Sequence, residues 1–242
     1  MRKTWLPVGL LWVAYTILLV VLVRYVNVLP NQWAEEAHVV DEAFMLLMYL
    51  GSPVMAMILA VMTWGVIAWR SDGAEREDGP NHHTNRAVVT TWLVLTSALA
   101  IGVVINPGFV GLAEIRGEPS SDYVIGIEAS QFFWEITYPN GATAVDELVI
   151  PAHKRVRYDV NSTDVVHSFW IPAFRVKIDA VPGLTTQLYI TATNVGTLED
   201  DHNLRIQCAE LCGAGHASMA LPVRVVSDAE WTEYIASIAG SG

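Results

Sequence analysis

A stretch of thirteen residues near the end of this 242-residue chain holds both of its cysteines, a histidine and a methionine. The four residues are Cys208, Cys212, His216 and Met219. Thiolates are soft donors, imidazole is borderline and a thioether is weak, a combination that suits copper better than hard cations. A mononuclear blue-copper site needs only one cysteine, so the second favours a second metal ion or calls for another explanation.

Three other interpretations compete. Two cysteines in an extracytoplasmic domain commonly form a disulfide. Zinc is bound by Cys and His, but structural zinc rarely recruits methionine. By chance, Met219 could fill the core and His216 could lie on the surface. None of these explains why four donors share a loop with Gly213 and Gly215, where the backbone can fold tightly around an ion.

A fifth donor, His167, lies about forty residues upstream, among apolar residues and before Pro172. Alone, such a histidine is more often a core or surface residue than a ligand. Together with the later loop it gives a cupredoxin layout, in which one histidine comes from an earlier strand end and the other ligands from a single late loop.

Three segments, spread over about the last 120 residues, share the spacing of one family. They are Asp164-x2-His167-Ser168, Lys177-x-Asp179-Ala180-x-Pro182-Gly183 and Cys208-x-Glu210-x-Cys212-x3-His216-x2-Met219. These segments closely resemble subunit II of heme-copper oxidases (cytochrome c oxidase), the subunit that carries the binuclear copper A centre.

The resemblance implies a copper A site of six residues: His167, Cys208, Glu210, Cys212, His216 and Met219. The two cysteines would bridge two copper ions, and each histidine would cap one. The methionine and the backbone carbonyl of Glu210 would be weak outer ligands. The Glu210 side chain would point away, towards a magnesium site shared with subunit I.

Two thiolates shared between two copper ions let one electron spread over both metals, so little geometry changes when it arrives or leaves. Such a site passes electrons and needs no open coordination position. The implied protein is an electron-transfer subunit of a terminal oxidase. It would take electrons from an extracytoplasmic cytochrome c or copper protein and pass them to heme in subunit I. There, O2 is reduced to water with coupled proton translocation.

Other functions remain open. A copper A subunit of a nitric oxide reductase would use the same loop with a different catalytic partner. A membrane-anchored copper carrier or assembly protein would hold one exchangeable copper ion instead of two tightly bound ones. A quinol oxidase subunit of the same fold is disfavoured, because such subunits lack the copper ligands. The chain has no CxxCH motif, so heme and the oxygen chemistry are expected on another chain.

The composition, 52% hydrophobic and 16% charged, is too apolar for an ordinary soluble protein. Apolar runs at about 5–28, 43–69 and 87–105 each approach the roughly 20 residues that cross a bilayer. The first run exceeds a signal-peptide core, and no small-x-small cleavage site follows before Trp33, so a retained helix is favoured. The third run is predicted to end at Asn106-Pro107-Gly108. The usual subunit II has two spans, matching the second and third here, so the first span is a departure.

The basic residues that border the spans predict the topology. Arg2 and Lys3 precede the first span, and Arg70, Arg76 and Arg86 lie between the second and third. The positive-inside rule places these segments in the cytoplasm and everything after the third span outside. The protein is therefore predicted to be an integral protein of a bacterial plasma membrane, with an extracytoplasmic copper domain.

From Asp122 onwards, apolar and polar residues alternate with a period of two, between turn signals such as Pro139-Asn140-Gly141. This pattern predicts an antiparallel, cupredoxin-like β-sandwich in an α+β membrane protein, with a transmembrane region 1–110 and a copper A domain 111–242. The copper loop would join two late strands. Ser227-x-x-Glu230 predicts a capping box at the start of a C-terminal helix, Asp228 to Ala239.

Two positions depart from the family. Its members carry a tryptophan thought to accept the electron from cytochrome c, and alignment on Gln131 places Phe132 there, with Trp134 two residues further on. Core packing is the alternative role for these aromatic residues. Many members also carry a glutamate at the mouth of a proton channel, where alignment on Trp92 places Val89.

The net charge of the predicted outer domain indicates what kind of electron donor it would attract. From Asn106 to the end there are 17 acidic and 8 basic residues. Their net charge of about −9 is most of the chain's net charge of −11. An acidic outer domain would attract a basic electron carrier in a salt-dependent manner. The candidate acidic groups are Asp146, Glu147 and Glu199-Asp200-Asp201. Nothing in the sequence suggests a nucleic-acid partner.

Overall fold

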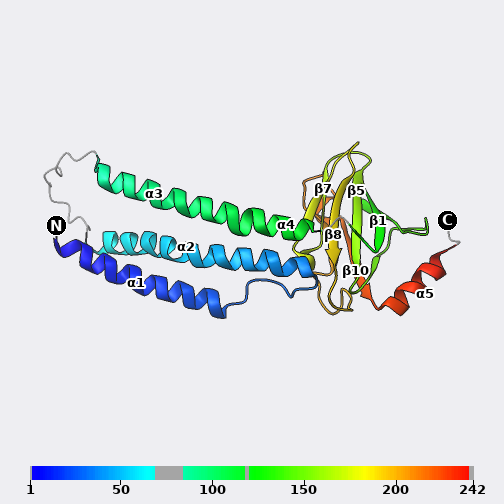
Figure 1. Ribbon diagram of the computed structural model, residues 1–242, viewed down its shortest axis with the longest axis horizontal. Coiled ribbons are helices and arrows are strands. Elements are labelled where there is room, and N and C mark those ends of the chain that lie inside the picture. Colours follow the sequence, from blue (N-terminus) through cyan, green and yellow to red (C-terminus); the bar gives the residue numbers. More distant parts are fainter. Residues whose placement is uncertain (1, 69–83, 118–119, 240–242) are drawn as a thin grey trace. The chain divides into compact units, whose positions relative to one another are not determined.

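The computed structural model describes residues 2–68, 84–117 and 120–239 (Figure 1). The chain divides into two compact units. The first unit contains Met1–Val28 and Glu42–Val110, and the second contains Leu29–Asp41 and Gly111–Gly242.

The first unit is built from long apolar helices. They are α1 (Arg2–Tyr25), most of α2 (Glu35–Ala68) and α3 (Arg86–Val103). Each is long and apolar enough to cross a membrane, so the prediction of three such helices is confirmed. Two hydrogen bonds join α1 to α2: Trp12 Nε1 donates to the Pro53 carbonyl at 2.8 Å, and Tyr15 Oη lies 3.1 Å from Thr63 Oγ1.

The second helix begins at Glu35, eight residues before the predicted span. Its first turn carries Glu35 and Glu36, and acidic side chains favour a helix N-terminus because they interact with the positive end of its dipole. The prediction from hydropathy began at the apolar residues and therefore left this polar turn out of the helix. Arg70 and Arg76, on which the topology prediction partly rests, lie outside the described residues.

The predicted helix stop at Asn106-Pro107-Gly108 is wrong in part. Asn106 does leave the helical region, with φ −137° and ψ 115°. Helical turns continue around it, however, through Val104–Phe109 (η1) into α4 (Val110–Arg116). Proline therefore kinks this helix instead of ending it.

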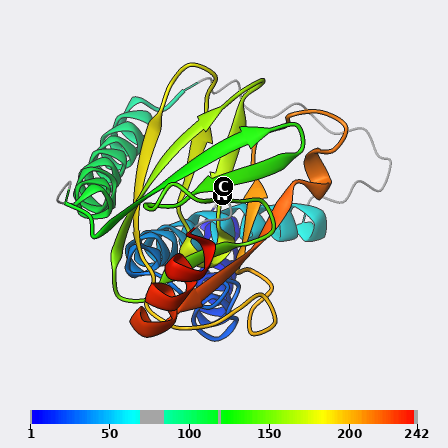
Figure 2. The same ribbon diagram turned by 90° about the vertical axis from the view of Figure 1, so that its right-hand side faces the viewer.

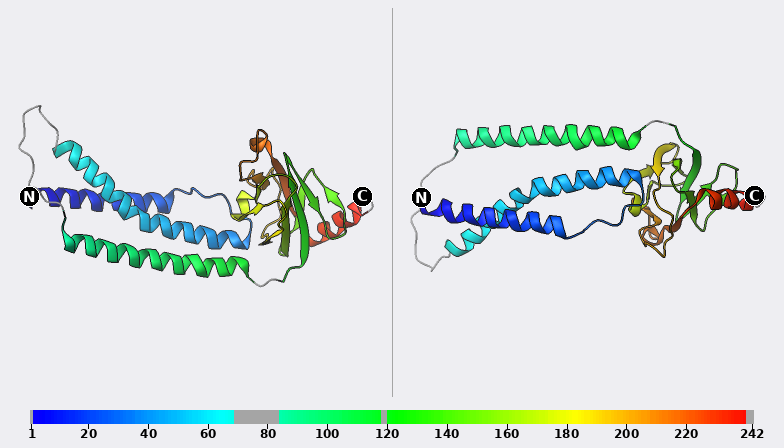
Figure 3. Two further views of the ribbon diagram at one scale, coloured as in Figure 1. Left: turned by 90° about the horizontal axis from the view of Figure 1, so that it is seen from above. Right: turned by 60° about the horizontal axis from the view of Figure 1, so that its bottom comes forward.

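The second unit contains a β-sandwich of two five-stranded sheets (Figures 2 and 3). One sheet has the order β3-β2-β1-β5-β8, and the other has the order β4-β10-β9-β6-β7. The strands of the first sheet are β1 (Tyr123–Ser130), β2 (Phe133–Thr137), β3 (Thr143–Ala144), β5 (Arg155–Ser162) and β8 (Thr186–Thr191). Those of the second are β4 (Leu148–Pro151), β6 (His167–Trp170), β7 (Lys177–Ala180), β9 (Arg205–Cys208) and β10 (Ala220–Val226).

The predicted sandwich is confirmed, but its sheets are mixed. β1 runs parallel to β5, and β4 runs parallel to β10, whereas the other ladders are antiparallel. Parallel neighbours need long connections, and period-two patterning does not distinguish the two kinds of pairing.

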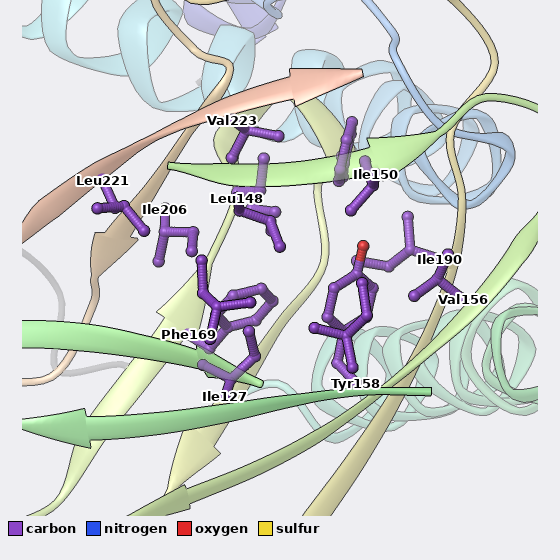
Figure 4. Close-up of a cluster of buried hydrophobic side chains, with 14 of the residues drawn as sticks. Ile127, Leu148, Ile150, Val156, Tyr158, Phe169, Ile190, Ile206, Leu221 and Val223 are labelled. Atoms are coloured by element: carbon purple, nitrogen blue, oxygen red, sulfur yellow. The ribbon is translucent and has the colours of Figure 1, made fainter. Parts of the chain in front are cut away.

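Alternating residues fill the space between the sheets. In β5, Val156, Tyr158 and Val160 are buried and the intervening residues are partly exposed, as the alternation predicts. Figure 4 shows Val156 and Tyr158 in one buried cluster with side chains from the opposite sheet, including Phe169 and Ile206. Burial of this apolar surface is the main contribution to the stability of the sandwich.

The segment Leu29–Asp41 belongs to the sandwich unit. Trp33 N donates to the Ala173 carbonyl at 3.2 Å, and Thr193 N donates to the Trp33 carbonyl at 2.9 Å. The indole of Trp33 donates to Asp201 at 3.0 Å. At the end of the segment, Asp41 accepts a hydrogen bond at 2.7 Å from Arg175, whose side chain is only 8% exposed.

The C-terminal helix α5 (Asp228–Ile238) begins as predicted. Ser227 and Glu230 make both hydrogen bonds of a capping box. The helix is anchored by Trp231, which is buried and lies edge-on to Tyr123 at a centroid distance of 5.2 Å.

Candidate metal centre

The residues predicted to bind metal are brought together by two neighbouring strands. His167 opens β6, Cys208 closes β9, and Phe169 of β6 pairs with Cys208. The chain then forms a loop to Met219 before β10 (orange in Figure 2). The β6–β9 ladder therefore carries an early histidine to the base of the cysteine loop.

The two cysteines are not bonded to each other. Their sulfur atoms lie 3.9 Å apart, whereas a disulfide has an S–S distance of about 2.05 Å. Both thiols are free and both side chains are buried. The disulfide interpretation does not describe this structure.

Each sulfur atom has an imidazole nitrogen beside it. Cys208 Sγ lies 3.8 Å from Nδ1 of His167, and Cys212 Sγ lies 3.7 Å from Nδ1 of His216. His167 is buried, and His216 is partly exposed. The contacts thus run in the order His167, Cys208, Cys212, His216, with the two sulfurs between the two imidazoles.

The two weaker donors lie at the same cluster. The Met219 sulfur is buried 3.8 Å from Cys212 Sγ, and the Glu210 carbonyl oxygen is 3.1 Å from Cys208 Sγ. The Glu210 side chain is exposed to solvent. Its backbone therefore faces the sulfur atoms, while its carboxylate is free to face outwards.

The donor set fits soft metal ions. His167, Cys208 and Cys212 form the only close cluster of three candidate ligands among residues 2–68, 84–117 and 120–239. A zinc–thiolate bond is about 2.3 Å long, so sulfurs 3.9 Å apart can both bind one ion. Thiolate, imidazole and thioether donors together select copper over hard cations.

A carboxylate fixes the orientation of His167. Asp164 Oδ1 lies 2.9 Å from Nε2 of His167, which leaves Nδ1 facing Cys208. Burial would raise the pKa of Asp164, but hydrogen bonds from His167 and from the backbone N–H groups of Val165 and Gln131 lower it to about 2. The carboxylate is therefore charged at neutral pH and holds the imidazole in one orientation, as is usual behind a metal-bound histidine.

The sulfur atoms are costly to ionise without a cation. Burial, together with hydrogen bonding and charge repulsion from Cys208, raises the pKa of Cys212 to about 11. Two adjacent buried thiolates repel each other, and a bound cation removes that penalty. The pair is thus arranged for a metal ion, not for free thiolates.

The two aromatic candidates lie in different environments. Phe132, in the turn between β1 and β2, is 37% exposed, and a Cβ added at Gly215 would overlap its ring. Trp134, in β2, is fully buried with its ring centroid 6.2 Å from that of His167. Phe132 thus covers the cysteine loop from the solvent side, and Trp134 packs beneath His167.

The predicted acidic patch is smaller in the structure than in the sequence. Glu147 forms an ion pair with Arg224 at 2.6 Å, and Asp201 is buried, with hydrogen bonds from Trp33 and Asn203. Asp146, Glu199 and Asp200 remain exposed.

In the first unit, Val89 lies in the first turn of α3 with an exposed side chain.

Two residues at the centre, Asp164 and Gln131, have no function predicted from the sequence. The Asp-x2-His spacing was a usable signal for Asp164, because it places a carboxylate near the histidine. Gln131 had no such signal, since it meets the cysteine loop only in the folded chain, through a hydrogen bond to the Cys212 carbonyl.

Comparison with known proteins agrees with this architecture. Residues 142–226 match the family of the cytochrome c oxidase subunit II periplasmic domain. Cytochrome c oxidase subunit 2 of Thermostichus vulcanus is 28% identical, and the match covers 82% of this chain and 75% of that protein. The subunit 2 of Alkalihalophilus pseudofirmus is 31% identical, and the match covers 63% of this chain and 45% of that one.

Among solved structures, the periplasmic domain of cytochrome oxidase subunit II from Bradyrhizobium japonicum is 32% identical. The match covers 50% of this chain and 95% of that domain, with a TM-score of 0.44. Helices able to span a membrane, a β-sandwich and a loop of soft donors define the class of membrane-anchored cupredoxin-like proteins. Within that class, the sandwich carries the periplasmic domain of the cytochrome c oxidase subunit II family, over residues 142–226. Its relatives are subunits of an oxidoreductase complex.

Proposed function

We propose that this chain is the electron-accepting subunit of a terminal heme-copper oxidase. The domain 111–242 would take electrons from an extracytoplasmic carrier, cytochrome c or a copper protein. It would deliver them to heme in subunit I, where O2 is reduced to water with coupled proton translocation. The observation that most directly supports this proposal is the cluster of two sulfurs, 3.9 Å apart, each with an imidazole nitrogen beside it.

In this proposal the ligands are His167, Cys208, Cys212, His216 and Met219, with the carbonyl of Glu210. When two copper ions are bound, the centre supplies a store for one electron shared over both metals. The chain's own residues keep that centre rigid: Asp164 orients one imidazole, and burial of Cys208, Cys212 and Met219 excludes water. Rigid donors lower the reorganisation needed when charge arrives.

The magnesium assignment rests on the resemblance alone. The Glu210 carboxylate is exposed and available to a partner. The resemblance implies that subunit I shares this site.

The topology belongs to the same proposal. The N-terminus would lie in the cytoplasm and the sandwich outside a bacterial plasma membrane. This orientation follows from the basic residues between the spans, and it places the metal centre where a soluble donor can reach it.

One experiment tests the function. The full-length chain is purified in detergent, and its copper content and electronic spectrum are measured; the intact complex is then examined for its hemes and terminal acceptor. Two tightly held copper ions and consumption of O2 support the proposal. One exchangeable copper ion indicates a carrier, and reduction of nitric oxide in place of O2 indicates the reductase alternative.

Phe132 is the better candidate for contact with the electron donor, because it is exposed and lies against the cysteine loop. Phe132→Ala is expected to lower kcat/KM for the reduced donor by about tenfold, since aromatic residues at the centre of an interface contribute most to binding. Copper content should not change. The measurement is steady-state oxidation of the donor by the intact complex.

Phe133→Ala is the matched control. Phe133 is the next residue and is also exposed, at 49%, but it starts β2. The atoms nearest to a Cβ added at Gly213 or Gly215 belong to Gln131 and Phe132, not to Phe133. Equal effects of the two substitutions would contradict the assignment of Phe132.

A further inference from the structure

The turn between β1 and β2 touches both segments that carry candidate ligands. Gln131 occupies this turn, directly after Ser130, the last residue of β1. On one side the turn meets the loop that precedes β6, where Ser130 Oγ lies 2.6 Å from Thr163 Oγ1. On the other side it meets the cysteine loop between β9 and β10.

Gln131 makes a hydrogen bond in each direction. Its side-chain Nε2 donates to the Cys212 carbonyl at 2.5 Å. Its backbone N–H donates to Asp164 Oδ2 at 2.7 Å, and Asp164 Oδ1 lies 2.9 Å from Nε2 of His167. Three consecutive hydrogen bonds therefore connect Cys212 to His167, two residues that are far apart in the sequence.

The cysteine loop is shaped to accept this contact. Gly213 has φ +134°, a conformation that other residues rarely adopt. A Cβ at Gly213 would lie 2.9 Å from Gln131 Nε2, too close for either group to keep its place. The backbone beside Cys212 thus approaches the turn as closely as a glycine permits.

We propose that Gln131 is a positioning residue for the metal centre. Its side chain holds the backbone at Cys212 against the carboxylate that orients His167, so the donors stand at binding distance before any metal arrives. The inference rests on the proposed function, because it assumes that this cluster binds metal. Groups that lock ligands in place commonly change metal affinity although they do not touch the ion.

Thiol alkylation of the metal-free, full-length chain in detergent tests the positioning directly. Cys208 and Cys212 are the only cysteines, and both are buried, so iodoacetamide reports on opening of this site alone. Gln131→Met removes the side-chain donor at similar size and keeps the backbone bond to Asp164. Since a hydrogen bond contributes roughly 0.5–1.5 kcal/mol, alkylation should be about two- to thirteenfold faster, and more so at Cys212 than at Cys208.

A second measurement concerns the copper-loaded chain. Gln131→Met should lose copper to a Cu(I) chelator faster by a similar factor, and its thiolate-to-copper absorption should shift. Gln187→Ala, an exposed glutamine on β8, is the matched control and should change neither rate nor spectrum. Gln131→Glu places an acceptor against the Cys212 carbonyl and should open the site further.

The outcomes are distinct. Alkylation of Gln131→Met at the wild-type rate overturns the positioning role, even if the wild type binds two copper ions. If both Gln131 variants lose the cooperative unfolding of the sandwich, the residue serves folding and the inference also fails. If the wild type binds no copper, the proposed function fails, but the alkylation rates still show whether Gln131 holds the loop.

Discussion

Cys212→Ser is expected to abolish the binuclear centre. The serine hydroxyl is a poor donor for copper, and Cys212 Sγ lies 3.7 Å from His216 Nδ1 and 3.8 Å from the Met219 sulfur. Copper content should fall from two ions to at most one. Electron transfer from the donor should fall by more than about 100-fold, since loss of a direct ligand exceeds the 10–100-fold cost of losing an outer partner. Metal analysis, electron paramagnetic resonance and donor oxidation measure these effects.

Met219→Leu is the control for this substitution. Met219 is buried in the same cluster, but a thioether is a weak donor and leucine has a similar volume. This variant should keep two copper ions and show a shifted spectrum. If Cys212→Ser keeps a spectrum typical of one electron shared by two copper ions, the bridging role of Cys212 is contradicted.

Asp41→Ala is expected to destabilise the sandwich unit by about 3–5 kcal/mol, because removing one partner of a buried ion pair leaves the other charge uncompensated. Asp41 and Arg175 are only 10% and 8% exposed, and their closest atoms are 2.7 Å apart. Urea unfolding of the full-length chain in detergent, followed by near-ultraviolet circular dichroism, measures the change.

Asp228→Ala provides the comparison. Asp228 also pairs with a basic residue, Lys154, but at 3.8 Å and with the aspartate 64% exposed. Its removal should cost about 1 kcal/mol or less. Equal losses of unfolding free energy in the two variants would show that the Asp41–Arg175 pair contributes no more to stability than the exposed pair.

Features that depend on residues close in sequence could be predicted. The alternation in β5 gives its buried face, and Ser227 with Glu230 gives the start of α5. The candidate ligands could be proposed from the sequence, because four of them lie within one loop. The convergence of His167 with that loop came from a family resemblance, and the structure supplies its physical basis in the β6–β9 pairing.

Features that depend on contacts between distant residues could not be predicted. The polar start of α2 resembles a loop by hydropathy, and it becomes helical where Glu36 accepts a hydrogen bond from Thr191 N at 3.1 Å. Strand alternation carries no information on direction, so the parallel β1–β5 ladder was missed. Gln131 resembles any polar turn residue until the fold places it against Cys212.

The segment Leu29–Asp41 sets a condition on how the domain with the candidate metal site can be produced alone. A water-soluble fragment begun at residue 111 would lack Trp33 and Asp41, and would leave Asp201 and Arg175 without hydrogen-bonding partners that they have in the whole chain. Because Arg175 follows the strand that carries His167, such a truncation would weaken the structure next to a candidate ligand. A fragment that retains this segment by fusion is therefore the better starting point for isolated spectroscopic work.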